Sequence, residues 1–207
     1  MRLYTFPTWT RLHYPGAMWE KKSLSRKTLY LTFDDGPDPD TTPWLLDELS
    51  YYSANATFFC VGENVERYPD LFERIVGGGH AVGNHTHRHL NGWKTPAFKY
   101  IEDVEEANVL INSKLFRPPY GRIRKQQFNR LKKRGFKTVF WSVMSYDFDR
   151  ELPAEIRLKS IRKNCQNGSV IVFHDSKKAF PQLKKELPVL LEQWQSEGFC
   201  FDAIEEN

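Results

Sequence analysis

Short apolar segments alternate with amphipathic segments along the chain, and this alternation constrains the fold more than any other feature of the sequence. The expected strands are residues 28–33, 56–61, 80–83, 114–117, 136–142, 169–173 and 199–203. The expected helices between them are residues 43–51, 64–76, 95–110, 124–134, 153–164 and 180–197. Strands that are apolar throughout and are separated by helices indicate a parallel sheet covered by helices.

The length of the chain narrows the α/β architectures that fit this pattern. A complete eightfold barrel usually needs about 250 residues, whereas this chain has 207. We therefore predict a distorted (β/α)7-type barrel that resembles a TIM barrel, with an open doubly wound sheet as the alternative. Residues 1–27 are expected to form an aromatic-rich arm packed on the domain, and residues 28–207 the domain itself.

Composition excludes several classes of protein. Hydrophobic residues make up 40% of the chain and charged residues 27%, a balance typical of globular proteins. No apolar run approaches the roughly 18 residues of a membrane span. The net charge of +4 is small, and the basic clusters at residues 132–134, 157–163 and 184–185 lie on polar faces of expected helices. We therefore expect no nucleic-acid or membrane partner, and a monomer.

The N-terminal segment and the cysteines bear on the compartment. A secretory signal needs about 7–15 consecutive apolar residues after a basic start, and basic side chains interrupt residues 1–31 throughout. Cys60 and Cys200 lie inside apolar runs, which predicts small core residues and not a disulfide framework or a zinc knuckle. We expect a cytoplasmic protein, or a periplasmic or secreted one if a signal segment has been removed.

Polar, titratable side chains follow five of the seven expected strands. They are Asp34 and Asp35, then His85, His87 and His89, then Arg117, then Asp147, and finally His174 with Asp175. In α/β barrels the carboxyl ends of the strands meet on one face, where ligands bind. Each group alone has a structural explanation, such as a turn or a surface charge. Five such groups on one face predict an active site.

The histidine-rich segment suggests a metal site. Asp35 with two imidazoles would make an N₂O donor set suited to zinc, with a coordination position left open for water. Histidines four residues apart share one side of a helical turn, whereas histidines two apart share one face of a strand. Spacing alone therefore leaves two choices, His85 with His89 or His85 with His87. Cobalt and nickel fit the same donors, because affinity does not separate them from zinc.

Four ordered motifs resemble those of the polysaccharide deacetylase family, carbohydrate esterase family four, also called the NodB-homology domain. They are Thr32-Phe33-Asp34-Asp35-Gly36-Pro37, His85-Thr86-His87-Arg88-His89, Arg117-Pro118-Pro119-Tyr120-Gly121 and Val172-Phe173-His174. The resemblance runs from about residue 28 to the C-terminus. It implies a distorted (β/α) barrel, one divalent metal ion and the hydrolysis of N-acetyl groups on amino sugars, in peptidoglycan-like or chitin-like glycans.

The resemblance also implies a role for each matching residue. Asp35, His85 and His89 are the implied metal ligands, which decides against His87. Asp34 resembles the general base, Arg117 its orienting partner, His174 the general acid, and the Tyr120 backbone N–H an oxyanion donor. The expected reaction is attack by a metal-activated water on the acetyl carbonyl, followed by protonation of the departing amine.

The fourth motif departs from the family pattern. The family often has Asp-x-x-Asp-Trp after the fifth strand, where this chain has Met144-Ser145-Tyr146-Asp147-Phe148. The resemblance implies that Asp147 pairs with Arg117, and that Phe148 and Val172 line an apolar pocket for the acetyl methyl group. Trp93, in a loop beside Gly92, is predicted to stack on a sugar face.

Two other functions fit the same residues. One is deacylation of a small amide that is not a sugar, and the other is a catalytically silent carbohydrate-binding module. A silent module is expected to have lost a base or a ligand, whereas this chain keeps Asp34, Asp35, His85, His89 and His174. Acetate release from N-acetylglucosamine oligomers would separate the three possibilities.

Overall fold

Every strand pair of the described sheet is parallel, as the buried apolar segments predict. The computed structural model describes residues 10–22 and 25–206. Its strands are β1 (Thr28–Asp34), β2 (Thr57–Cys60), β3 (Ala81–Asn84), β4 (Leu115–Phe116), β5 (Lys137–Thr138), β6 (Val143–Met144), β7 (Val170–His174) and β8 (Cys200–Phe201). Their order is β5-β4-β3-β2-β1-β7-β6, and β8 pairs with the start of β1.

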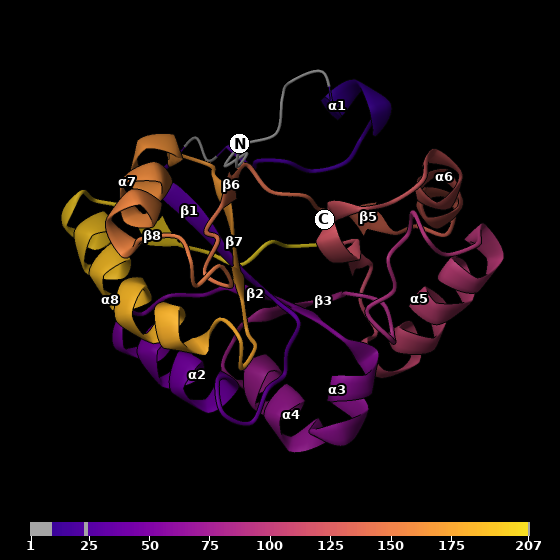
Figure 1. Ribbon diagram of the computed structural model, residues 1–207, viewed down its shortest axis with the longest axis horizontal. Coiled ribbons are helices and arrows are strands. Elements are labelled where there is room, and N and C mark those ends of the chain that lie inside the picture. The colour runs from indigo at the N-terminus through magenta and orange to yellow at the C-terminus, as the bar shows by residue number, and fades with distance from the viewer. Residues whose placement is uncertain (1–9, 23–24, 207) are drawn as a thin grey trace.

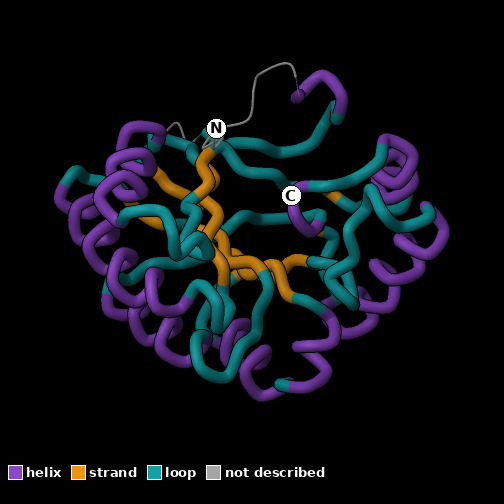
Figure 2. The backbone as a smooth tube through the Cα atoms, in the orientation of Figure 1, coloured by secondary structure: helices purple, strands orange, loops and turns teal. Residues whose placement is uncertain are grey.

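The helices from α2 to α8 lie along the outer side of this curved sheet (Figures 1 and 2). The helices are α1 (Thr10–His13), α2 (Thr42–Tyr51), α3 (Gly62–Arg67), α4 (Pro69–Gly77), α5 (Ala97–Ile111), α6 (Lys125–Lys133), α7 (Ala154–Asn164) and α8 (Phe180–Ser196), with a 3-10 turn η1 (Pro119–Gly121). A doubly wound sheet carries helices on both faces. The structure therefore confirms the distorted, incomplete barrel and excludes the doubly wound alternative.

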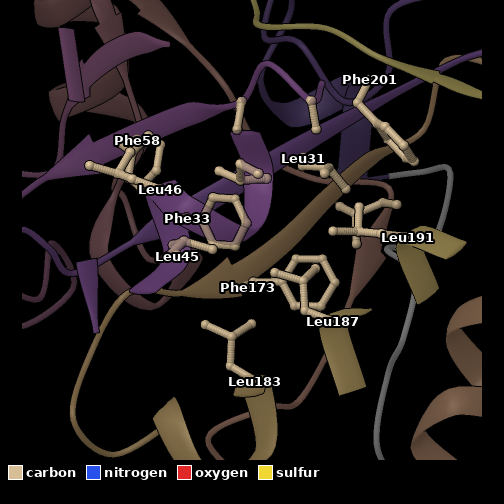
Figure 3. Close-up of a cluster of buried hydrophobic side chains, with 14 of the residues drawn as sticks. Leu31, Phe33, Leu45, Leu46, Phe58, Phe173, Leu183, Leu187, Leu191 and Phe201 are labelled. Carbon is tan, nitrogen blue, oxygen red and sulfur yellow. The ribbon is translucent and has the colours of Figure 1, made fainter. Parts of the chain in front are cut away.

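The core has an outer layer between sheet and helices and an inner layer inside the curve. Leu31 and Phe33 of β1 and Phe173 of β7 pack outward against one face of α8 (Figure 3). That face is a row of leucines at helical spacing, Leu183, Leu187 and Leu191. Tyr30, the residue before Leu31 in β1, belongs to the inner cluster. The period-two alternation along β1 thus supplies both layers.

The expected strand 136–142 is wrong as a single strand. Lys137 and Thr138 pair with β4, whereas Val143 and Met144 pair with β7. These partners lie on opposite sides of β1 in the strand order, so the residues between β5 and β6 cross from one edge of the sheet to the other. The apolar sequence does not reveal this change of partner, because apolar residues on both sides of the crossing, such as Phe136 and Val143, are buried.

Residues near the N-terminus lie against this crossing. Met18 forms a bridge with Val139, Glu20 forms one with Ser169, and the Trp19 ring stacks on Phe140 at 4.2 Å between centroids. Of the expected arm, residues 1–9 and 23–24 lie outside the described residues. In residues 10–22 and 25–206, no helix combines the length and the apolarity that crossing a membrane requires.

The expected helix 64–76 is two helices, α3 and α4, because Pro69 starts a new one. Proline disfavours the helical conformation in the residue before it, and Tyr68 has φ −130° and ψ 58°. Cys60, Cys165 and Cys200 are free thiols, and Cys60 is fully buried in the core as expected.

Candidate active site

The predicted site residues meet at the carboxyl end of the sheet. Asp34 ends β1 and lies opposite His174, which ends β7. His85 follows β3 directly, and Arg117 follows β4 directly. The paired parallel strands bring these ends together, and the contacts below join the residues in one cluster. The expectation that the strand ends converge is confirmed.

Asp35, His85 and His89 form a compact group of metal-ligating side chains. One ligand atom from each lies within 4.8 Å of the others. Nε2 of His89 is 3.2 Å from Oδ1 of Asp35, and Nε2 of His85 is 3.8 Å from the same oxygen. Spacing left His87 open as a ligand, but its Nε2 lies 3.5 Å from Glu106 and 4.0 Å from Glu66. The geometry therefore brings His89 and not His87 to Asp35.

The backbone around this trio takes conformations that are costly for residues other than glycine. Asp35, Thr86 and His89 have φ values of 83°, 66° and 53°. Such conformations persist where the surroundings hold them, and they gather at functional sites. The side-chain amide of Asn64 donates to the Asp35 carbonyl at 2.8 Å, and the Thr86 N–H donates to Asn84 Oδ1 at 2.9 Å.

Two of the three donors, His85 and Asp35, are held in the protonation state that binds a divalent ion. Nδ1 of His85 lies 2.8 Å from the Arg117 carbonyl, to which it donates, so its Nε2 carries the lone pair. Burial lowers the pKa of His85 to about 4, which keeps the imidazole neutral at pH 7. Burial raises the pKa of Asp35, but the hydrogen bond from His89 and the histidine charges outweigh burial and leave that pKa below its usual range. Two imidazoles and one carboxylate form a donor set that fits zinc.

Asp34 is held by Arg117. Nη1 of Arg117 donates to Oδ1 of Asp34 at 2.7 Å and to Oγ1 of Thr32 at 2.6 Å. Its other nitrogens donate to the carbonyls of Val139 and Phe140 at 3.1 and 2.9 Å. The guanidinium is fully buried, so this hydrogen-bond set fixes it and with it one oxygen of Asp34.

Asp147 holds His174 and not Arg117, so the predicted Asp147–Arg117 pair is wrong. Oδ1 of Asp147 lies 2.8 Å from Nδ1 of His174, and Oδ2 accepts the His174 backbone N–H at 2.7 Å. The reason is topological. The pairing of β6 with β7 sets Met144 beside Val172, so the residues after each strand meet. Arg117 follows β4, on the other side of β1, where its guanidinium already donates four hydrogen bonds to other acceptors.

The Asp147 contact changes the acidity of His174. Burial alone would lower the pKa of His174, but the charge of Asp147 and its hydrogen bond raise that pKa to about 9, with help from the carboxylates of the site. The imidazole is therefore protonated at pH 7. Asp147 is itself buried and also accepts a hydrogen bond from Ser145 Oγ at 2.9 Å.

The remaining predicted residues lie around these pairs. The Phe148 ring contacts the His174 ring edge-on at 4.9 Å between centroids, and the exposed Tyr120 ring contacts His89 at 4.7 Å. Trp93 is exposed and lies on the adjoining loop, next to Arg122. Val172 is fully buried in the inner cluster, and its place in an acetyl pocket stays a prediction.

Asp175 also follows a predicted strand, but the sequence indicates no role for it. Its side chain is fully buried, its Oδ2 accepts the Thr42 hydroxyl at 2.7 Å, and its backbone N–H donates to the Asp34 carbonyl at 2.7 Å. Burial and the nearby negative charges raise the pKa of Asp175 to about 8. A Cβ on Gly36 would lie 2.2 Å from Oδ2, so Asp175 packs directly under the loop after Asp35. Adjacency to His174 was the only sequence signal.

Known proteins share this sequence and this fold. The sequence model of the polysaccharide deacetylase family matches residues 21–139. A peptidoglycan-N-acetylglucosamine deacetylase of Bacillus cereus is 34% identical over 194 residues, which are 91% of this chain and 91% of that protein. A chitooligosaccharide deacetylase of Azorhizobium caulinodans is 34% identical over 159 residues, 73% of this chain and 75% of its own. A solved peptidoglycan N-acetylglucosamine deacetylase with a bound benzamide derivative has a TM-score of 0.87 at 29% identity, covering 96% of this chain and 95% of that one. The chain therefore belongs to the polysaccharide deacetylase family.

Proposed function

We propose that Asp34 is the general base and His174 the general acid of this deacetylase, and that they work on either side of a metal ion held by Asp35, His85 and His89. One observation carries the proposal. Each acid–base residue has its own buried partner, Arg117 for Asp34 and Asp147 for His174. Two titratable groups held separately at neighbouring strand ends are the arrangement that proton transfer at two points of one reaction requires.

Asp35, His85 and His89 would hold one divalent ion, with zinc as the first candidate and cobalt or nickel as alternatives. Such an ion, when bound, supplies Lewis acidity, which makes a water more acidic and a carbonyl more electrophilic. The trio contributes three protein donors, the number found in catalytic zinc sites that keep a further position open.

Asp34 accepts the proton of the attacking water in this proposal. Its Oδ1 is engaged by Arg117, so Oδ2 is the oxygen proposed to accept the proton. The guanidinium fixes the position of the carboxylate. Asp34 is also next to the proposed ligand Asp35 in sequence. The proposed proton acceptor therefore lies beside the proposed metal site.

His174 supplies the proton to the leaving amine. Its pKa of about 9 keeps it protonated at pH 7, and Asp147 holds Nδ1, so Nε2 is the nitrogen left to donate. An amide nitrogen leaves poorly as an anion, so this proton lowers the barrier of the second step. The Tyr120 backbone N–H is proposed as the donor that stabilises the tetrahedral oxyanion.

The proposed substrate is a glycan that contains N-acetylglucosamine, because the relatives described above are named for peptidoglycan N-acetylglucosamine and for chitooligosaccharides. Phe148 and Val172 are proposed to face the acetyl methyl group, and Trp93 to stack on a sugar ring. The cytoplasmic location and the monomeric state stay predictions, which cell fractionation and sedimentation would test.

Acetate release tests this function. Metal-loaded protein is given N-acetylglucosamine oligomers, peptidoglycan strands and a set of small N-acetyl amides. The proposal predicts acetate from the glycans and little from the small amides. Turnover of the small amides alone would favour the non-sugar deacylase, and glycan binding without any acetate would favour the silent binding module.

A further inference from the structure

Two loops beside the metal trio bring an exposed indole and two guanidinium groups together. The Arg122 guanidinium lies 5.2 Å from the centroid of the Trp93 ring, and the Arg124 guanidinium donates to the Trp93 carbonyl. We call Trp93, Arg122 and Arg124 the basic platform. Over half of the Trp93 surface (56%) is exposed, although this is a large apolar side chain. Exposed aromatic rings on a well-ordered surface are characteristic of binding sites.

A buried glutamine braces the platform from below. Gln127 is fully buried, and its side-chain amide donates to the carbonyls of Gly92 and Thr95 at 2.9 and 3.0 Å. Its Oε1 accepts the Arg124 backbone N–H at 2.7 Å. One residue thus ties both loops together. Trp93 itself donates from Nε1 to the Ile123 carbonyl at 3.3 Å, so the orientation of the indole is set before any ligand arrives.

The platform carries an uncompensated positive charge. Residues 90–95 and 118–125 contain four basic side chains, Lys94, Arg122, Arg124 and Lys125, and no acidic one. Within residues 10–22 and 25–206, no carboxylate forms an ion pair with Arg122 or Arg124. Arg88, by contrast, is already paired with Asp103 and Glu106 on the neighbouring helix. The guanidinium groups of the platform are therefore available to an anion.

The platform lies next to the catalytic centre. Trp93 is four residues after the proposed ligand His89, so their Cα atoms are separated by at most about 14 Å. Tyr120, two residues before Arg122, contacts the His89 ring, and the Gly92 N–H donates to the Arg122 carbonyl at 3.2 Å. A glycan whose acetyl group lies at the trio would therefore place a neighbouring sugar on the platform.

We infer that the basic platform binds a sugar that carries a carboxylate, so that the enzyme prefers an anionic glycan to a neutral oligomer of N-acetylglucosamine. The indole presents an apolar face to a sugar ring, and a guanidinium recognises a carboxylate through paired, charge-assisted hydrogen bonds. This inference rests on the proposed function, because it assigns the charge of the substrate at that same site.

The test compares three ligands of equal length by their dissociation constants and by acetate release. They are a neutral N-acetylglucosamine oligomer, a strand in which alternate sugars carry a lactyl carboxylate without stem peptides, and the same strand with its carboxylates converted to methyl amides. Wild-type protein should bind the carboxylated strand about tenfold more tightly than the other two. Raised salt should reduce this preference.

Arg122→Gln should remove most of the preference, because it should weaken binding of the carboxylated strand more than binding of the neutral oligomer. Lys133→Gln is the matched control, because it removes one exposed positive charge at the far end of α6. Equal affinity of wild type for all three ligands would overturn the inference, and so would an equal loss on all three in Arg122→Gln. Tight binding only when stem peptides are present would move the recognised carboxylate from the sugar to the peptide, which also contradicts it. Selective binding of the carboxylated strand without acetate release would support the basic platform as a binding site and contradict the proposed function.

Discussion

Nδ1 of His174 lies 2.8 Å from one oxygen of Asp147, while the backbone N–H of the same histidine donates to the other oxygen at 2.7 Å. This two-point contact fixes the ring and holds a positive charge on it. It also separates the proposed acid from the proposed base, since Asp34 has its own partner in Arg117. Each proposed proton-transfer group therefore has its own buried partner, and mutation can perturb the two groups separately.

The first consequence is a pH dependence set by Asp147. His174 must be protonated to act as an acid, so activity is present below its pKa of about 9 and is lost as the pH rises through that value. Asp147→Asn removes the charge that raises the pKa, and burial then lowers it. The alkaline limb of kcat should move to lower pH by about 1–3 units. Metal content should stay unchanged, and an unmoved limb would show that Asp147 does not control the acid.

The second prediction concerns the base. Asp34→Asn should keep the metal and the fold but lower kcat by about 10²–10⁴, because an amide cannot accept the proton. Asp40→Asn, an exposed carboxylate 3.6 Å from Lys177 on the surface, serves as the control and should have normal kcat. Normal turnover by Asp34→Asn at neutral pH would refute the assigned role.

The third prediction separates the histidines of one segment. His89→Ala should strip the metal, because it removes one donor of three, whereas His87→Ala should retain it, because that ring faces Glu106 and Glu66. Metal content after dialysis, measured by elemental analysis, decides between them. Loss of metal from His87→Ala alone would show that the ligand set is wrong.

The fourth prediction concerns the loop that carries Asp35. A Cβ on Gly36 would collide with the buried Asp175 side chain, so Gly36→Ala should lower the free energy of unfolding by about 1–3 kcal/mol. Gly77→Ala is the control, since nothing lies within 4 Å of its Cβ position in α4 and alanine favours helices. Thermal or denaturant unfolding checks both. Equal free energies of unfolding for the two variants would show that the Asp175 side chain moves aside at little cost, which contradicts the prediction.

The strand ends were predictable from the sequence because polar residues follow buried runs, a local signal. The choice of partners was not, since it depends on which strands become neighbours. Asp147 was assigned to Arg117, and only the pairing of β6 with β7 shows that it belongs to His174. Residues 136–142 were predicted as one strand for the same reason, because the sequence does not show that the chain changes its neighbouring strand there. Gln127 gave no signal at all, because a glutamine in a basic helix is typical of a solvent-exposed face.

Zinc titration of metal-free protein tests the central claim most directly. Acetate release from an N-acetylglucosamine-containing glycan is measured as zinc is added, for wild type and for His89→Ala. The account predicts no release without metal, and in wild type a rise that saturates at one zinc per chain, with no comparable rise in His89→Ala. Full acetate release from the chelator-treated wild type, or an equal zinc response in His89→Ala, would contradict it.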